Sequence, residues 1–240
     1  MRAVRIITAM KTATRMIDAA ATLRLLAWLS PSFPTGAYAY SHGLEWAVES
    51  GDIGDGETLR IWLEDVLANG AGRSDAILLR HAHRAAEDPE TLADLAELAA
   101  AASPARERQV ETLGQGGAFV AAATPWHSNN LIALAERLGR ERIAYPVAVG
   151  ALAGAHAIPE DATVAGYLEA FTANLISAAV RLVPLGQTVG LRVLVALEPA
   201  ILRLAAETRD ATLDDLGGCA FRSDIAALRH ETQYTRLFRS

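Results

Sequence analysis

Apolar residues recur along the chain at the three- and four-residue spacing of amphipathic helices, with polar residues between them. The clearest stripe lies in residues 59–67 and consists of Leu59, Trp62, Leu63, Val66 and Leu67. Comparable stripes, separated by prolines and glycines, predict further helices near residues 22–29, 40–50, 74–87, 89–98, 104–123, 131–138, 144–156, 164–183 and 188–207. No run of alternating apolar and polar residues predicts a strand. The pattern therefore predicts one all-α domain of about nine or ten helices.

Two of these segments carry a further expectation about packing. Residues 188–207 are apolar nearly all round, which is typical of a helix at the centre of a bundle. Gly150 and Gly154 lie four residues apart, so they share one helix face. A face without side chains predicts close contact with a neighbouring helix.

Composition and charge exclude several classes of protein. Of the 240 residues, 51% are hydrophobic and 21% are charged, which is typical of a folded chain rather than a disordered one. The net charge of −6 makes nucleic acid a poor candidate partner. The charge is unevenly distributed along the chain. Positions 1–44 contain five basic residues and one acidic residue, and positions 222–240 contain four arginines and two carboxylates. The single cysteine, Cys219, excludes an internal disulfide, fits a cytoplasmic location and is expected to be a buried, inert thiol.

The first 21 residues contain Arg2, Arg5, Lys11 and Arg15 but no apolar run typical of a secretory signal. We expect residues 1–21 to be a poorly ordered extension and residues 22–240 to be the helical domain, with Thr22 capping its first helix. The longest run of apolar residues and glycine, positions 147–155, is far shorter than the roughly 20 residues that cross a bilayer. A membrane is therefore not an expected partner.

No catalytic constellation is recognisable in the sequence. It contains no phosphate-binding P-loop, no Gly-x-Ser-x-Gly elbow and no His-Glu-x-x-His motif. His81 and His83 lie two residues apart, so on a helix their rings point in nearly opposite directions and cannot easily share a metal ion. Asp214 and Asp215 have no second acidic motif to complete a metal site. We therefore predict no catalytic residue, no metal ligand and no cofactor.

Two segments differ from an ordinary helical bundle. Residues 28–45 combine aromatic residues, among them Phe33, Tyr38 and Tyr40, with a rigid turn rich in proline and glycine. These aromatic residues are either core residues or a preorganised contact surface. The C-terminal residues 229–240 combine arginines with Tyr234, Leu237 and Phe238. Such residues favour docking to a partner or to the body of the chain over a frayed tail.

These two segments, together with Arg-Leu-Val-Pro-Leu-Gly-Gln at residues 181–187, resemble the UreF family of urease accessory proteins. The order and spacing of the three motifs along residues 22–240 also agree with that family. The resemblance implies an all-helical, non-enzymatic and dimeric protein that binds the accessory protein UreD, also called UreH. It further implies recruitment of the GTPase UreG, control of its GTP hydrolysis, and delivery of nickel to apo-urease.

The resemblance also assigns partner-binding positions in this sequence. They are Tyr38, Tyr40, Ser41, His42 and Glu45 in the first segment, Arg181 and Gln187 in the second, and Arg229, His230, Glu231, Tyr234, Arg236, Leu237, Phe238 and Arg239 in the third. Arg181 is the candidate for GTPase gating. We expect the tail to fold back near the proline-rich loop, so that the two form the UreG-facing surface. The alternatives are an all-α metal-dependent enzyme, which would need at least three convergent carboxylate or imidazole groups, and a generic helical scaffold unrelated to nickel.

Overall fold

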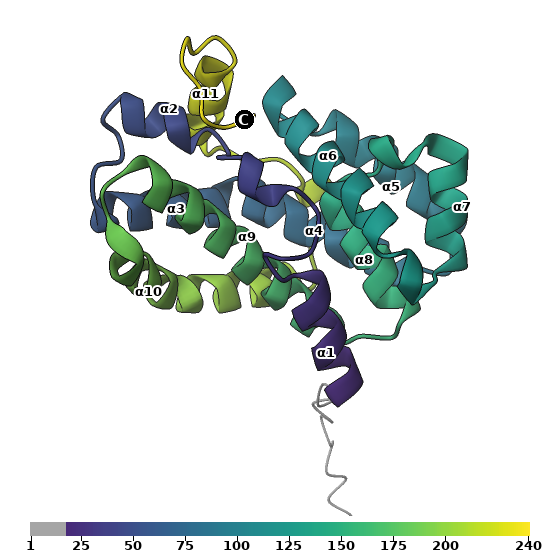
Figure 1. The fold of residues 1–240 in the computed structure, drawn as a ribbon. Coiled ribbons are helices and arrows are strands. Elements are labelled where there is room, and N and C mark those ends of the chain that lie inside the picture. The colour runs from purple at the N-terminus through teal and green to yellow at the C-terminus, as the bar shows by residue number, and fades with distance from the viewer. Residues whose placement is uncertain (1–17) are drawn as a thin grey trace, which may run out of the picture.

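The computed structural model describes residues 18–240, which form helices joined by turns, with no strand among them (Figure 1). The expectation of a single all-α domain is confirmed. The α-helices are α1 (Ala19–Trp28), α2 (Leu44–Glu49), α3 (Gly56–Asn69), α4 (Ala71–Arg84), α5 (Pro89–Ala101), α6 (Arg106–Ala122), α7 (Asn129–Leu138), α8 (Tyr145–Ala155), α9 (Glu160–Leu182), α10 (Gly186–Glu207) and α11 (Phe221–His230). Single 3-10 turns are η1 (Ala37–Ala39), η2 (Thr124–Trp126), η3 (Arg140–Arg142) and η4 (Leu213–Asp215).

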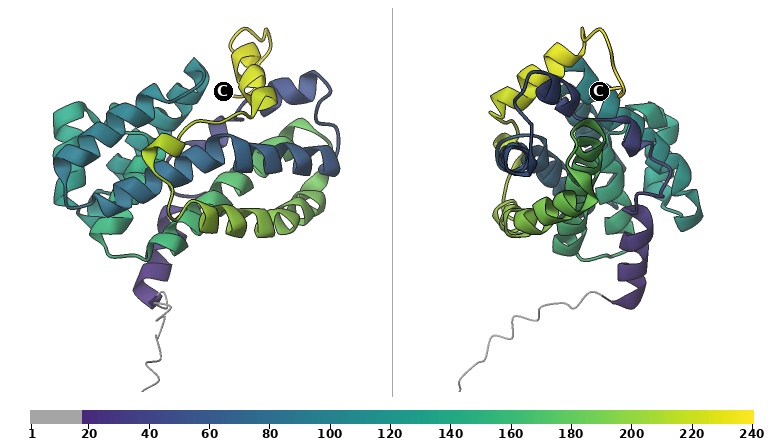
Figure 2. Two further views of the ribbon diagram at one scale, coloured as in Figure 1. Left: turned by 180° about the vertical axis from the view of Figure 1, so that it is seen from behind. Right: turned by 60° about the vertical axis from the view of Figure 1, so that its left-hand side comes forward.

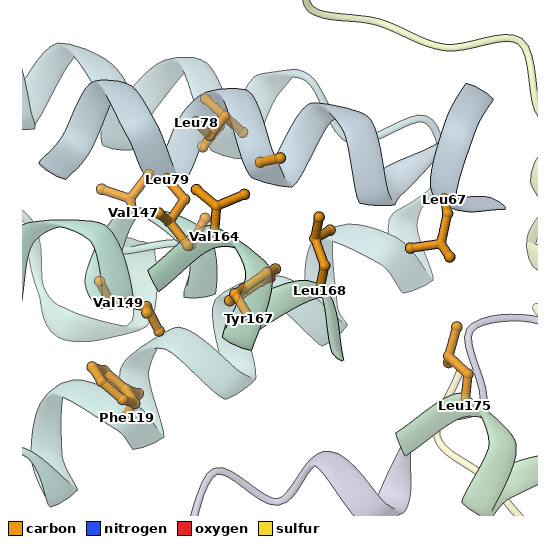
Figure 3. Packing of buried hydrophobic residues seen from close by; sticks show 14 of the residues in the cluster. Leu67, Leu78, Leu79, Phe119, Val147, Val149, Val164, Tyr167, Leu168 and Leu175 are labelled. Atoms are coloured by element: carbon orange, nitrogen blue, oxygen red, sulfur yellow. The ribbon is translucent and has the colours of Figure 1, made fainter. Parts of the chain in front are cut away.

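Helix α4 runs through the middle of the molecule and packs along α8 (Figures 1 and 2). Figure 3 shows the core around this pair, with Leu78 and Leu79 of α4 above Val147 and Val149 of α8. A side chain at Gly150 or Gly154 would collide with backbone carbonyl oxygens of α4. The predicted close helix contact at these two glycines is confirmed.

The remaining helices cover this centre from two sides. Helices α3, α9 and α10 lie on one side of the molecule, and α5, α6 and α7 lie on the other side with α8 (Figures 1 and 2). Helix α11 packs against α2 and α6, and the C-terminus lies between α11 and α6. This arrangement places the end of the chain beside segments that lie far away in the sequence.

Helix α10 does not lie at the centre of the bundle. The expectation that residues 188–207 form a central helix is therefore wrong. It packs with one face on α9 and α3, and buries Val193, Leu197, Ile201 and Leu204 there. The opposite face leaves Leu191, Val195 and Leu202 each 63% exposed. The helix carries apolar residues on both faces, but within residues 18–240 a neighbour packs against only one of them.

The start of the first helix also differs from the expectation. Asp18 is the N-cap of α1 and accepts a hydrogen bond of 2.6 Å from the Ala21 N–H, whereas Thr22 lies inside the helix. Residues 19–21 are therefore helical. The rest of the expected extension, residues 1–17, lies outside the residues that the structure describes.

Candidate protein-docking site

The three segments singled out in the sequence meet at one place in the structure. Arg181, at the end of α9, donates a hydrogen bond of 2.8 Å from Nη1 to the Tyr38 carbonyl oxygen. The same guanidinium lies over the Phe238 ring, 4.5 Å from its centroid, in a cation–π contact. One side chain thus joins the loop, the end of α9 and the C-terminal tail. We call residues 229–240 the tail and residues 29–45 the loop.

The loop takes its shape from residues that exclude a helix. Pro31 and Pro34 interrupt the chain after α1, and Gly36 adopts a positive φ of 74° before the turn η1. His42 and Gly43 follow with φ values of 61° and 76°. A side chain at Gly43 would meet the Ala227 backbone nitrogen at 2.9 Å, so the glycine allows α11 to approach the loop. The predicted approach of the tail region to the loop is therefore observed.

Glu45, in the first turn of α2, holds the backbone of the tail. Its Oε1 accepts a hydrogen bond of 2.6 Å from the Leu237 N–H, and its Oε2 accepts one of 3.0 Å from the Phe238 N–H. Ser41 holds Ser240, because its N–H and its hydroxyl both donate to the Ser240 carbonyl oxygen. Arg239 donates its N–H to the Ala39 carbonyl oxygen at 2.8 Å. The tail is therefore anchored by directed hydrogen bonds as well as by apolar contact.

His230 lies fully buried between two carboxylates. Its Nδ1 is 2.7 Å from Glu107 Oε2, and its Nε2 is 3.0 Å from Glu45 Oε2. Arg236 adds a cation at the same place, because its Nη1 lies 2.9 Å from Glu107 Oε1. The imidazole and the guanidinium of the tail thus both face carboxylates of α2 and α6.

A second polar cluster lies around Glu111 of α6. Its Oε2 is 3.1 Å from His42 Nδ1 and accepts a hydrogen bond of the same length from the Ser240 hydroxyl. Burial raises the pKa of Glu111, against the effect of the neighbouring Arg108. Burial likewise lowers the pKa of Arg108 to about 10, and this side chain donates to the Ser223 hydroxyl at 2.9 Å. Helix α6 therefore fixes the loop, the tail and α11 together.

The expected partner-binding residues divide into two groups by exposure. Those exposed to solvent are Tyr38, Arg181, Gln187, Arg229, Tyr234, Arg236, Leu237 and Arg239. Those buried are Tyr40, Ser41, His42, Glu45, His230 and Phe238, whereas Glu231 is half-buried. The aromatic residues of the loop thus divide between core and surface. The buried residues hold the tail in place, so only the exposed group can contact a partner in this conformation.

Sequence reasoning missed the contribution of α6. Glu107, Glu111 and Gln115 are buried at spacings of four residues, so they form one polar stripe on the inner face of the helix. A polar stripe beside a short run of apolar residues gives no local sign that it is buried. The sequence feature that could have indicated this buried stripe is the positive charge of the tail, because a docked cationic segment needs carboxylates nearby.

The histidines and the cysteine occupy ordinary structural positions. His81 Nε2 is 3.1 Å from the Ala211 carbonyl oxygen, and His83 Nε2 is 2.7 Å from that of Ile158. Within residues 18–240, no group of three or more histidine, cysteine or carboxylate side chains could hold a metal ion. Cys219 is exposed, so the expectation of a buried thiol is wrong. Its N–H donates to the Asn69 carbonyl oxygen at 2.8 Å, and the adjoining Gly217 and Gly218 leave no side chains to cover the sulfur.

A cavity of about 370 Å³ lies beneath the loop, between α4, α6 and α9. Asp75 lies on its wall and accepts a hydrogen bond of 2.7 Å from the Tyr167 hydroxyl. Figure 3 shows Tyr167 on α9, close to the core residues of α4 and α8. Burial raises the pKa of Asp75 to about 7. The lining of this cavity does not form a set of metal ligands among the described residues.

The fold and the site together define an all-helical protein whose C-terminal tail is docked against the loop after its first helix. None of the described helices is long and apolar enough to cross a membrane. The family model described as UreF matches residues 53–198, which is more than half of the chain.

Curated relatives match the chain over nearly its whole length. It is 53% identical over 226 residues to the urease accessory protein UreF of Rhodopseudomonas palustris (strain TIE-1), covering 93% of this chain and 94% of that protein. It is 55% identical over 221 residues to UreF of Xanthobacter autotrophicus (strain ATCC BAA-1158 / Py2), covering 91% and 90%. The chain belongs to the UreF family of urease accessory proteins, and the resemblance stated from its motifs is confirmed. Its relatives are named as accessory proteins rather than enzymes.

Proposed function

We propose that this chain is a urease maturation chaperone that bridges UreD and the GTPase UreG in the complex that inserts nickel into apo-urease. The observation that carries the proposal is the junction of Arg181 with Tyr38 and Phe238, which joins the three family motifs. Nickel is the cargo of that complex in this proposal, and this chain contributes no ligand to it.

The exposed side chains around this junction form the proposed UreG-facing surface. Tyr38, Tyr234 and Leu237 present large apolar or aromatic groups to solvent, and Arg236 and Arg239 lie among them. Arginine and tyrosine are frequent energetic anchors of protein interfaces. The buried hydrogen bonds of Glu45 and Ser41 keep this surface preorganised, which reduces the entropy lost on binding.

Arg181 is the residue through which we propose that GTP hydrolysis on UreG is gated. Burial lowers the pKa of its guanidinium, which is held between the Tyr38 carbonyl and the Phe238 ring. A contact made by UreG with either Tyr38 or the tail would therefore change the surroundings of this cation. Gln187, in the first turn of α10, is the second proposed contact of that motif.

The proposal includes a homodimer in the cytoplasm. The uncovered face of α10, with Leu191, Val195 and Leu202, supports self-association because exposed apolar stripes of this kind are unusual on monomers. This face belongs to a different helix from the docked tail, so one protomer can use both at once.

The experiment that tests the proposal is a binding assay with purified UreD and UreG, followed by nickel-dependent activation of apo-urease. We expect the full chain to bind both proteins and to support activation. A chain lacking residues 237–240 should keep its helical circular dichroism spectrum and UreD binding, but lose UreG. Failure of the full chain to bind UreD would leave only a helical scaffold unrelated to nickel, and would contradict the proposal.

Two tyrosines of the loop provide matched variants for the same assay. Tyr38 is exposed, so Tyr38→Ala should weaken UreG binding without lowering the melting temperature. Tyr40 is buried, so Tyr40→Ala should lower the melting temperature. If Tyr38→Ala left UreG binding unchanged, the loop would not belong to the UreG-facing surface.

A further inference from the structure

The turn η1 of the loop is held in place by hydrogen bonds rather than by packing. None of its residues, Ala37, Tyr38 and Ala39, is buried. Ala37 and Tyr38 instead line the cavity of about 370 Å³ beneath the loop, so there is open space on that side of the turn. Gly36 and the prolines before it exclude a longer helix, which would have supplied further backbone hydrogen bonds. The position of η1 therefore depends on the groups that bond to it from other parts of the chain.

Each of the successive carbonyl oxygens of η1 accepts a hydrogen bond from outside the loop. The Ala37 oxygen accepts one of 3.2 Å from Nδ2 of Asn174. The Tyr38 oxygen accepts one of 2.8 Å from Nη1 of Arg181, and the next oxygen accepts one of the same length from the Arg239 N–H. The turn is thus bonded to two side chains of α9 and to the backbone of the tail.

Asn174 approaches the turn from the same face of α9 as Arg181, because the seven residues between them make nearly two full turns. The orientation of its amide follows from its partner. A carbonyl oxygen only accepts hydrogen bonds, so the amide nitrogen must face it. Among the described residues, Asn174 provides the one side-chain hydrogen bond from α9 to η1 apart from that of Arg181.

The two α9 side chains differ in how easily a partner can displace them. Arg181 is exposed, and its guanidinium is shared between the turn, the Phe238 ring and the Ser177 carbonyl oxygen. A contact of UreG that displaces this guanidinium breaks its bond to the turn. Asn174 is shorter, half-buried and part of the cavity lining, so it keeps its bond to the turn when Arg181 moves.

We propose that Asn174 is the positioning residue of the Arg181 gate, because its amide holds η1 on α9 and keeps the Tyr38 carbonyl oxygen within reach of Arg181. This inference rests on the proposed function and adds to it a residue that lies outside the three family motifs. Asn174 acts through Arg181 and does not itself contact UreG. Without its hydrogen bond the turn moves over the cavity, and the guanidinium of Arg181 loses a fixed acceptor.

The experiment compares the rate of GTP hydrolysis by purified UreG with and without the complex of this chain and UreD. The ratio of the two rates measures the gate. Asn174→Leu has nearly the same side-chain volume but no N–H donor, and should move this ratio towards one by about fivefold, the equivalent of one net hydrogen bond. Asn174→Gln keeps the amide on a longer side chain and should restore part of the ratio. Asn130→Leu is the matched control, because Nδ2 of Asn130 donates to the Ala86 carbonyl oxygen at 2.9 Å, away from the loop.

Two further measurements separate a positioning role from a general loss of stability. Hydrogen exchange of the Ala39 and Tyr40 amides, which close η1, should become several-fold faster in Asn174→Leu with no UreG present. In a chain that already carries Arg181→Ala, Asn174→Leu should change the hydrolysis ratio no further, since it acts through Arg181. The melting temperature and UreD binding should match those of Asn130→Leu. Asn174→Ala replaces the leucine variant if that one does not fold.

Unchanged exchange at Ala39 and Tyr40 would overturn the inference, as would an equal change of the hydrolysis ratio in Asn130→Leu. A further change of the ratio on adding Asn174→Leu to Arg181→Ala would also overturn it. If the unaltered chain binds neither UreG nor UreD, or if Arg181→Ala leaves the ratio unchanged, the proposed function itself fails. The exchange measurement distinguishes the two cases, because it reports on the Asn174 bond without UreG.

Discussion

The backbone carbonyl oxygen of Ser240 accepts two hydrogen bonds from Ser41, one from its N–H and one from its hydroxyl, both 2.6 Å long. The two residues are 199 positions apart, so the last residue of the chain is fixed only when the loop is already in place. Contacts over such separations close a long stretch of chain, so they slow folding and depend on the rest of the fold. The docked position of the tail is therefore a property of the whole fold rather than of the last few residues.

Ser41→Ala removes one of the two hydrogen bonds and leaves the backbone bond in place. We expect the free energy of tail docking to fall by about 1 kcal/mol, the usual net contribution of such a bond. Hydrogen exchange of the Leu237 and Phe238 amides measures this change directly, because both are protected by Glu45. Thr232→Ala is the control, since that hydroxyl is exposed and bonds only to the nearby Arg229 carbonyl. Equal exchange in the two variants would show that Ser41 does not hold the tail.

Glu45→Gln should destabilise the tail more strongly than Ser41→Ala. The amide nitrogen of glutamine would face an N–H donor, and His230 would lose one of its two carboxylates. We expect a loss of about 2–4 kcal/mol, since buried N–H donors lose the carboxylate that accepts their hydrogen bonds. Urea denaturation measures the loss. Glu57→Gln, in an exposed ion pair, serves as control and should change stability far less.

Local patterns predicted much of this molecule. The all-α fold and the close approach of some neighbouring helix at Gly150 follow from periodicity and residue size, which act over a few residues, whereas the identity of that neighbour, α4, does not. The approach of the tail to the loop was inferred from a run of arginine and aromatic residues that would otherwise be a liability. These predictions succeeded because each depended on a signal contained in one segment.

The features that were not predicted depend on what surrounds a segment. Leu191 and Val195 on the outer face of α10 remain uncovered because no helix within residues 18–240 packs against that face. Phe221, Ile225 and Leu228 on the outer face of α11 are exposed in the same way. Cys219 was expected to be buried on residue type alone, and its loop has no neighbour that covers it.

Arg80 is the opposite of these exposed apolar residues, because it is a charged residue buried in the core. It is 1% exposed and lies among Glu160, Asp161, Thr208 and the Ala205 carbonyl oxygen, with which its guanidinium hydrogen-bonds. These partners lie at least 80 positions away in the sequence, so no local pattern indicates the site.

Arg80→Met tests the contribution of this buried cation. Methionine has a comparable length and removes the charge, but it leaves the Ala205 carbonyl unpaired, whereas Glu160 keeps Arg84 and Asp161 keeps Arg209. We expect a loss of about 2–4 kcal/mol in chemical denaturation. Arg60→Met, which breaks two solvent-screened pairs on α3, should lower stability far less. If both variants lost the same stability, the burial of Arg80 would have no energetic consequence.

Asp75→Asn should change how stability depends on pH. Burial raises the pKa of Asp75 to about 7 from an ordinary value of 3.8, and the nearby Glu111 carboxylate acts in the same direction. The folded state therefore binds this proton more tightly than the unfolded state does. Its contribution to stability falls as pH rises from about 4 to 7, by at most about 1.4 kcal/mol per pH unit. Above pH 7 the full cost of the buried charge remains.

Asparagine carries no charge and can still accept the hydrogen bond from the Tyr167 hydroxyl. Relative to the unaltered chain, the Asp75→Asn variant should therefore gain stability from pH 5 to pH 8, measured by urea denaturation at each pH. Asp88→Asn is the opposite control, because the Thr91 side chain and backbone N–H hydrogen-bond to this exposed N-cap and lower its pKa. The Asp88 carboxylate thus stabilises the folded state above its ordinary pKa, and that contribution is lost as the pH falls through the lowered value. A stability difference between the Asp75→Asn variant and the unaltered chain that stayed constant from pH 5 to pH 8 would show that this carboxyl group titrates as it does in water.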